Sequence, residues 1–249
     1  MSKLAGRIRR AGRVEPAPLG FAAAAARAPR PTMLCLVRLS ANEANKIGEA
    51  AAQDADAVVI DDAAPDKLKD QIVKAGELPV GVRIAAASRQ DVASCQQAGV
   101  DFVVLQPDSM AEALLEDNIG VLIALTTVPD DTDHRQLGEI GLNALIVPAP
   151  PAPLTVERLL SLRRIASVAH TPLLTEISAD IGPSQLRLLR ESGVVGVIIG
   201  AQSLGKLSSL RERVASLPPR GRKREERADA LLPAQALAGD HEDDYEEDE

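Results

Sequence analysis

Aromatic side chains are scarce in this chain of 249 residues, which has no Trp, two Phe and one Tyr. Proteins that bind single-stranded nucleic acids stack the bases on such side chains, so we expect no specific nucleic-acid binding. Cysteine is scarce too, and Cys35 and Cys95 lie in apolar patterns without the spacing of metal ligands. This use of cysteine predicts buried, reduced thiols in a cytoplasmic protein rather than a disulfide framework.

Long apolar runs are also missing. The longest are strand-sized, such as 121–125, or rich in alanine and followed directly by Arg27. A membrane-spanning helix needs about 20 apolar residues, so we expect no transmembrane segment. The Arg-rich, acid-poor start of the chain is also typical of an organellar transit peptide, which leaves import as an alternative to a cytoplasmic location.

Charge is distributed unevenly along the chain, whose formal net charge is -8. Residues 1–32 hold seven basic side chains and one acidic one (7 - 1 = +6), whereas residues 219–249 hold five and eleven (5 - 11 = -6). We therefore expect a mostly disordered basic arm rich in Ala, Arg and Pro over 1–32, and a disordered tail with an acidic end over 219–249. Residues 4–13 of the arm have the pattern of a short basic amphipathic helix, which two glycines weaken. The tail either aids solubility, or it shields the basic arm or recruits a basic partner.

Short apolar runs and helix-period segments alternate between residues 33 and 218. Nearly every residue of each run is apolar, as a strand buried on both faces of a parallel sheet requires. Eight such units can form an open doubly wound sheet or a closed ring. Even spacing favours closure, because a ring has no edge strand to protect. The sequence thus predicts one compact (β/α)8 barrel over 33–218, with strands at 33–39, 57–61, 79–84, 101–106, 119–126, 143–148, 172–177 and 194–200.

Helix boundary signals agree with this pattern. Ser88 with Asp91 and Ser109 with Glu112 have the spacing of capping boxes at helix starts. Glycines at the opposite helix ends predict left-handed C-terminal caps, at Gly76, Gly99, Gly141 and Gly193.

The last two units resemble those of phosphate-binding aldolase-type barrels such as thiamine phosphate synthase. The resemblance lies in PLLTEISADIG (172–182) and LLRESGVVGVIIGA (188–201). In that group the loops after strands seven and eight hold a substrate phosphate. The resemblance implies that Gly200, Ala201 and the nearby Ser203 contact a phosphate.

A second resemblance is to the citrate lyase β-subunit and HpcH/HpaI aldolase group. It rests on ADAVVIDDAAP (55–65), GVRI (81–84) and GVDFVVLQP (99–107), which are similar to the second, third and fourth strands of those barrels. The arginine of the third strand contacts an acidic substrate in that group. The resemblance therefore implies that Arg83 binds the substrate.

Reactive groups of such a barrel belong at the carboxyl ends of the strands, which we call the mouth. Side chains from alternate strands share a layer, so four from odd strands are expected to meet there, namely Arg38, Arg83, Thr126 and Glu176. The two guanidiniums would bind a phosphate or carboxylate, and Glu176 would orient them or act as a base. The alternative is a self-satisfied cluster of charges that plugs the barrel.

Two further strand ends carry candidates. Asp61 and Asp62 are neighbours, so only one points inward, either as a catalytic group or ligand or as the partner of an arginine. Gln106 follows the fourth strand and is a candidate for substrate binding. No lysine lies at a strand end, which excludes Schiff-base chemistry.

The loop after the fifth strand is acidic, with Asp130, Asp131, Asp133 and His134. Oxygen ligands suit Mg2+ or Mn2+, so these residues are a candidate metal site. Closely spaced acids beside a proline also serve as turn and cap residues, which is the alternative.

Two functions follow from these residues. The first is a barrel that binds a small anionic metabolite, phosphorylated or carboxylate, at its mouth, with lyase or isomerase chemistry through Glu176 or Asp61. The second is a catalytically degenerate barrel that acts as a scaffold through its charged arm and tail. The sequence leaves both open.

Overall fold

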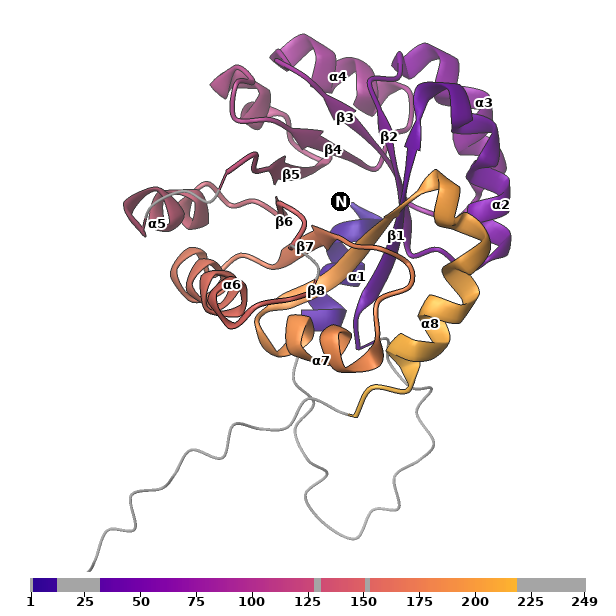
Figure 1. Ribbon diagram of the computed structural model, residues 1–249. Coiled ribbons are helices and arrows are strands. Elements are labelled where there is room, and N and C mark those ends of the chain that lie inside the picture. Colours follow the sequence, from indigo (N-terminus) through magenta and orange to yellow (C-terminus); the bar gives the residue numbers. More distant parts are fainter. Residues whose placement is uncertain (1, 13–31, 128–130, 151–152, 219–249) are drawn as a thin grey trace, which may run out of the picture.

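Eight parallel strands form a closed barrel (Figure 1). The computed structural model describes residues 2–12, 32–127, 131–150 and 153–218. The strands are β1 (Leu34–Ser40), β2 (Ala57–Asp61), β3 (Val80–Ile84), β4 (Phe102–Leu105), β5 (Gly120–Ala124), β6 (Ala144–Val147), β7 (Leu173–Glu176) and β8 (Val194–Gly200). Each pairs with its neighbour in the sequence, and β1 also pairs with β8 to close the ring. The predicted barrel is therefore confirmed, with a strand at each of the eight apolar runs.

Helices surround the strands as an outer ring (Figure 1). They are η1 (Ala41–Lys46), α2 (Ile47–Ala52), α3 (Pro65–Ala75), α4 (Arg89–Gln97), η2 (Ala111–Leu115), α5 (Asp131–Glu139), α6 (Val156–Ala169), α7 (Pro183–Glu191), η3 (Ala201–Lys206) and α8 (Leu207–Ala215). The four expected cap glycines have φ values of 60, 86, 80 and 98°. The connection between β4 and β5 has only the short 3-10 helix η2, and it therefore covers less of the barrel wall than an α-helix would.

Of the two expected capping boxes, one is present. Ser88 Oγ accepts a hydrogen bond from Asp91 N, and the Asp91 carboxylate accepts one from Ser88 N. Ser109 does not cap a helix, because η2 begins at Ala111 after Met110. Its Oγ accepts hydrogen bonds from the backbone N–H groups of Ala87 and Gln106, both at 3.2 Å. It thereby ties the ends of two neighbouring strands together.

Apolar side chains form two layers, because strand residues alternate between the two sides of the barrel wall. Residues such as Val37, Ile60 and Val103 pack against the helices in the outer core. Residues such as Leu36, Val59 and Val104 fill the interior. Phe102 takes up the space beside Gly81, where an added Cβ would lie 2.2 Å from its ring. The interior is therefore packed solid below the mouth.

A helix closes the floor of the barrel. Residues 3–12 of the expected basic arm form α1 (Lys3–Gly12), which Figure 1 shows in indigo at the end of the barrel. Its residues Leu4, Ile8 and Ala11 belong to the inner core and are 0, 1 and 5% exposed. The expectation that the arm is mostly disordered is thus corrected for these residues, and 13–31 lie outside the described residues.

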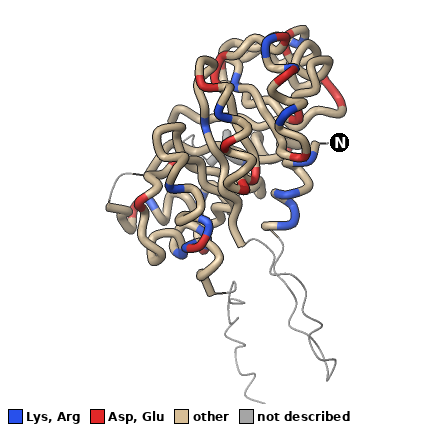
Figure 2. The backbone as a smooth tube through the Cα atoms, turned by 90° about the vertical axis from the view of Figure 1, so that its right-hand side faces the viewer, with Lys and Arg blue, Asp and Glu red and all other residues tan. Residues whose placement is uncertain are grey.

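Polar contacts fix α1 in place. The Asp101 carboxylate, just before β4, accepts hydrogen bonds from the backbone N–H groups of Lys3 and Leu4 at 2.7 and 2.9 Å. It also accepts one from Ser2 Oγ at 2.8 Å. These bonds satisfy N–H groups that a helix start leaves free. Arg7 donates from the side to the backbone carbonyls of Asp56 and Glu77. The basic residues of this helix lie close to the N-terminus in Figure 2.

Both cysteines are buried and free. Burial and the charge of Asp56 raise the pKa of the Cys35 thiol to about 12, and burial with the charge of Asp91 raises that of Cys95 to about 11. Because the thiolate is the reactive form, we expect neither thiol to react with Ellman's reagent in the native protein at about pH 8. Both should react once guanidinium chloride unfolds the chain. Rapid labelling of a native thiol would contradict this burial.

Among the described residues, no helix is long and apolar enough to cross a membrane.

Candidate functional site

Four charged side chains meet at the mouth of the barrel. Arg38 comes from β1, Asp61 from the end of β2, Arg83 from β3 and Glu176 from the end of β7. Their positions follow from the strand register, because Asp61 pairs with Arg83 and lies two residues beyond Val59, the partner of Arg38. Arg38, Asp61 and Glu176 each lie two residues beyond an inner-core residue of their own strand, and Arg83 lies two residues beyond Gly81, which faces the inner residue Phe102. Residues two apart on a strand share a face, so all four point toward the barrel axis.

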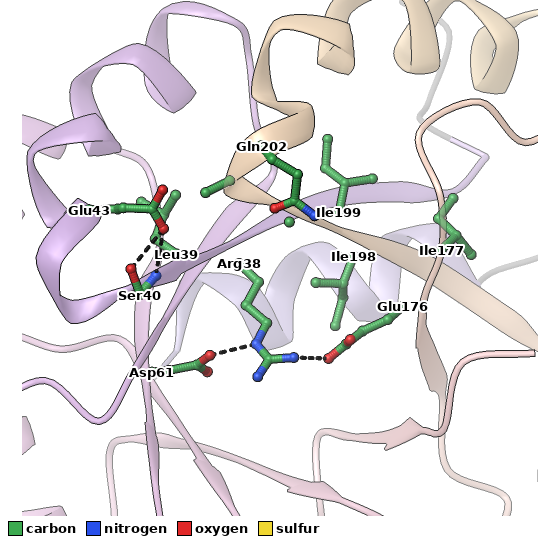
Figure 3. Close-up of a pocket in the computed structure, with 12 residues that line it drawn as sticks. Arg38, Leu39, Ser40, Glu43, Asp61, Glu176, Ile177, Ile198, Ile199 and Gln202 are labelled. Atoms are coloured by element: carbon green, nitrogen blue, oxygen red, sulfur yellow. Dashed lines mark hydrogen bonds and ion pairs between the residues drawn. The ribbon is translucent and has the colours of Figure 1, made fainter.

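Arg38 lies between the two carboxylates (Figure 3). Its Nε donates to Asp61 Oδ2 at 2.6 Å, and its Nη1 donates to Glu176 Oε1 at 2.7 Å. Burial lowers the pKa of Arg38, but the hydrogen bond to Asp61 and the charge of Glu176 outweigh that effect and raise it overall. Arg38 is therefore already held by two short, charge-assisted hydrogen bonds.

Arg83 approaches the same two carboxylates without bonding to them. Its Nη1 lies 3.9 Å from Asp61 Oδ1 and its Nη2 lies 3.9 Å from Glu176 Oε1. Its side chain is 17% exposed, and Nε of Arg83 and Oδ1 of Asp61 are buried without hydrogen-bond partners among the described residues. Within that part of the chain the Arg83 guanidinium donates no hydrogen bond. A charged group this deep usually has a partner, so Arg83 has donors to spare for a ligand or water.

A cavity of about 330 Å3 adjoins the cluster on the side of β1, β7 and β8. Arg38, Asp61 and Glu176 line it, whereas Arg83 lies outside its wall. Its other wall is the junction of β8 with η3, and Figure 3 shows the Gln202 side chain folded over this junction. An added Cβ at Gly200 would lie 2.5 Å from the terminal amide of Gln202, so the Gln202 side chain would have to move to make room for it.

Glu43 also lines this cavity and is fixed by its own contacts. Its carboxylate accepts hydrogen bonds from Lys46 Nζ at 2.9 Å and from Ser40 Oγ and N at 2.8 and 3.3 Å. Together with the charge of Lys46, these bonds lower the pKa of Glu43 from 4.5 to about 2. Glu43 is therefore ionised at neutral pH and paired with Lys46 at this edge of the mouth.

The Glu43 carboxylate gives a pH-dependent prediction. Because its folded pKa is depressed to about 2, its contribution to stability is complete above the ordinary value of 4.5 and is lost as the pH falls toward 2. We expect its carboxyl carbon to titrate near the lower value in an NMR experiment, and Glu43→Gln to remove that signal. A midpoint near 4.5 would show that the contacts with Lys46 and Ser40 do not form.

The structure brings together most of the predicted mouth residues, but not all of them. Gly200 and Ala201 line the cavity beside Arg38. Gln106 and Thr126 line a second pocket instead, at the ends of β4 and β5. Thr126 is exposed and makes no contact with the charged cluster among the described residues, so its expected place there is wrong. Ser203 lies on η3 and lines neither pocket.

The predicted metal residues are mostly outside what the structure describes. Asp130 is not described, and Asp131, Asp133 and His134 lie on α5 with side chains that are not described either. Within the described part of the chain, no group of three or more His, Cys, Asp or Glu side chains is placed to hold a metal ion.

Sequence reasoning overlooked Glu43 as a residue of the site. The signal was present, because Ser40 and Glu43 have the spacing of a capping box directly after the first strand. Both parts of that box are present at the start of η1. A capping residue directly after a barrel strand lies at the mouth, and the box could therefore have been read as a site residue as well.

Comparison of this chain with known proteins identifies similar folds but no related sequence. No family profile and no curated protein sequence matches this chain. Solved structures do. A 3-hexulose-6-phosphate synthase has a TM-score of 0.56 at 14% identity, over 74% of this chain and 98% of that one. A thiamine phosphate pyrophosphorylase from Pyrococcus furiosus has 0.54 at 17%, over 73% and 95%. The citrate synthase SbnG has 0.53 at 15%, over 68% and 86%.

At these identities the similarity concerns the arrangement of the strands and helices. It agrees with the closed ring of eight strands and with both sequence resemblances. The protein therefore has the fold of the aldolase-type TIM barrels.

Proposed function

We propose that the mouth of this barrel binds a small anionic metabolite, either phosphorylated or a carboxylate. The observation that carries the proposal is the state of Arg83, a mostly buried guanidinium that donates no hydrogen bond to the described residues. Hydrogen bonds between charged groups are about twice as strong as neutral ones, so an anion is a favourable partner for these free donors. Asp61 and Glu176, each 3.9 Å away, keep the guanidinium aimed at the mouth.

The remaining contacts would be divided around the cluster. Arg38 has one terminal nitrogen, Nη2, that is not used in its bonds to Asp61 and Glu176. Gly200 and Ala201 offer a close backbone approach on the side of the cavity, with Ser203 behind them, and Gln106 would supply an amide on the opposite side. Hydroxyl groups of the metabolite would donate to the two carboxylates, which accept hydrogen bonds only.

Proton transfer next to an anion is the chemistry that such a site supports, as in lyase or isomerase reactions. Arg38 engages only Oε1 of Glu176, which leaves Oε2 for a substrate proton. Asp61 is the second candidate, because it also lines the cavity. In this proposal the arginines hold the negative charge of the substrate while one carboxylate moves the proton. The acids Asp130, Asp131, Asp133 and His134 stay a proposal for binding Mg2+ or Mn2+.

A second candidate is a barrel without catalysis that acts as a scaffold. The observation that favours it is that Arg38 bonds to both Asp61 and Glu176, as expected of a structural charge cluster. Its contacts with protein partners would then come from the charged ends of the chain.

A thermal-shift screen separates the two candidates. Phosphorylated and dicarboxylate metabolites would be tested on the wild type and on Arg83→Ala, each with and without Mg2+. A ligand at 100 times its Kd stabilises the folded state by about 2.7 kcal/mol. For a chain of this size that raises Tm by roughly 5–10 °C. We expect such a shift in the wild type and its loss in the variant. A flat screen would favour the scaffold.

A further inference from the structure

The second pocket lies outside the proposed anion site. It has a volume of about 500 Å3 and lies at the ends of β4 and β5, between η2 and α5. Its barrel wall consists of Leu105, Ile123 and Leu125, and Leu114 and Leu137 close it from the two helices. Pockets of this size with mostly apolar walls are where proteins hold small molecules.

The pocket exists because one helix of the outer ring is short. Between β4 and β5 the chain forms only η2, a 3-10 helix of five residues. The outward-facing ends of these strands are therefore left without a full helix over them. Nearby apolar side chains remain in contact with water, since Met110 is 57% and Ile140 45% exposed. Burial of this surface against an apolar group would be favourable.

The two sites differ sharply in charge. The mouth cavity is lined by Arg38, Glu43, Asp61 and Glu176, whereas none of the described residues that line the second pocket is charged. Its polar groups are neutral amides and hydroxyls such as Gln106 and Thr126. An ionic group gains nothing from such walls, but an uncharged chain or ring does.

Gln106 connects this pocket to Arg83. Arg83 pairs with Val104 across β3 and β4, and Gln106 lies two residues further along the same strand direction. Neighbouring strands are about 4.8 Å apart and rise about 3.3 Å per residue, which puts the Cα atoms of Arg83 and Gln106 roughly 8 Å apart. Gln106 continues the series of the inner residues Phe102 and Val104 at every second position, so it faces the mouth while it also lines the pocket.

We infer that the ligand of this barrel is amphipathic, with its anionic head at Arg83 and an uncharged apolar part in the pocket over β4 and β5. This inference rests on the proposed function for its head group. It adds the substrate class, namely phosphates or carboxylates that carry an acyl chain or ring. Gln106 stands where the two parts of such a ligand join.

Two pairs of anions test this, each with the same head and a different tail. They are methyl phosphate against n-hexyl phosphate, and malonate against n-hexylmalonate, measured by calorimetric titration of the full chain. Each buried methylene is worth about 0.8 kcal/mol, or roughly fourfold in affinity. We expect the hexyl compound of at least one pair to bind at least tenfold more tightly than its short partner.

Pocket variants show where the tail lies. Ala111→Trp fills the pocket from an exposed position of η2, and Ile140→Gln makes its exposed edge polar. We expect both to abolish the advantage of the hexyl chain while binding of the short anion stays the same. Leu115→Trp is the matched control, because Leu115 lies on the same helix, is 62% exposed and does not line the pocket. Arg83→Gln should weaken both members of a pair equally.

Other results would overturn the inference in distinguishable ways. If short and hexyl anions bound with equal affinity and both required Arg83, the ligand would have no apolar tail in the pocket, and the proposed function would still stand. If Arg83→Gln did not change the affinity for the hexyl anion, the apolar pocket and the anion site at the mouth would bind different ligands. If light scattering showed a dimer and hexyl phosphate dissociated it, the pocket would be the contact surface for a second copy of the chain. Binding of no anion at all would overturn the proposed function itself.

Discussion

Removal of residues 1–12 is expected to destabilise the barrel by about 5 kcal/mol, because Leu4 and Ile8 are worth about 1.5–3 kcal/mol each when fully buried and Ala11 adds less. All three side chains are at most 5% exposed and belong to the inner core. Such a loss is a large part of the 5–15 kcal/mol that typically stabilises a domain. For a chain of this length it lowers Tm by roughly 10–20 °C, which differential scanning calorimetry measures directly.

A point substitution avoids the ambiguity of a deletion. Ile8→Ala keeps the helix and its polar contacts but leaves a cavity in the inner core, at a cost of about 3 kcal/mol. Arg10→Ala is the matched control, because Arg10 is exposed on the same helix and bonds only to the carbonyl of Gly6. We expect it to change stability by less than about 0.5 kcal/mol. If Ile8→Ala had the same Tm as the wild type, α1 would not be docked in the barrel.

Replacement of each mouth arginine by glutamine is expected to affect a different property, anion binding for Arg83 and stability for Arg38. Arg83→Gln should weaken anion binding at least tenfold, because a hydrogen bond to a charged group is worth about 1.5–3 kcal/mol. It should change stability little, since its ion pairs are 3.9 Å long. Arg38→Gln should instead lower stability, by about 2 kcal/mol, because Asp61 and Glu176 lose their short bonds to a guanidinium and keep only Arg83 at 3.9 Å.

Calorimetric titration and denaturant unfolding of the same samples separate these effects. Arg187→Gln is the control, because Arg187 is exposed on α7 and pairs with Glu191 on the same helix. It should leave both binding and stability unchanged. If Arg83→Gln bound anions with the affinity of the wild type, Arg83 would not contact the anionic head group, and the proposed function would lose its main support.

The barrel could be predicted from the sequence because its cause is local and repeated. Strands buried on both faces must be apolar at nearly every position, and eight such runs at even spacing leave few alternatives to a ring. The strands found, such as β2 (Ala57–Asp61) and β8 (Val194–Gly200), have the bounds that the apolar runs predicted. Boundaries elsewhere differ by one or two residues.

The mouth cluster could be predicted in part. Alternation along the strands places Arg38, Arg83 and Glu176 in one layer, and the structure joins them through Asp61. Thr126 follows the same alternation but lies beyond the end of β5, so it leaves the layer. Sequence cannot show that Arg38 is hydrogen-bonded to the carboxylates while Arg83 is not, because that depends on distances of 2.6 and 3.9 Å.

The docking of the floor helix in the barrel and the second pocket were missed for different reasons. Leu4, Ile8 and Ala11 have helical spacing, but two glycines and many arginines made the segment look like a solvated arm. Its docking depends on Asp101, almost a hundred residues away in the sequence. The pocket had a visible sign, the shortest interval between successive strands, whose consequence appears only when η2 is seen to leave the wall uncovered.

The most direct test is a crystal structure of the protein with the ligand that gives the largest shift in the screen. We expect an anionic oxygen of that ligand about 2.9 Å from a guanidinium nitrogen of Arg83, at the mouth of the barrel. A ligand bound elsewhere, with Arg83 still unbonded or bonded only to water, would contradict the anion site.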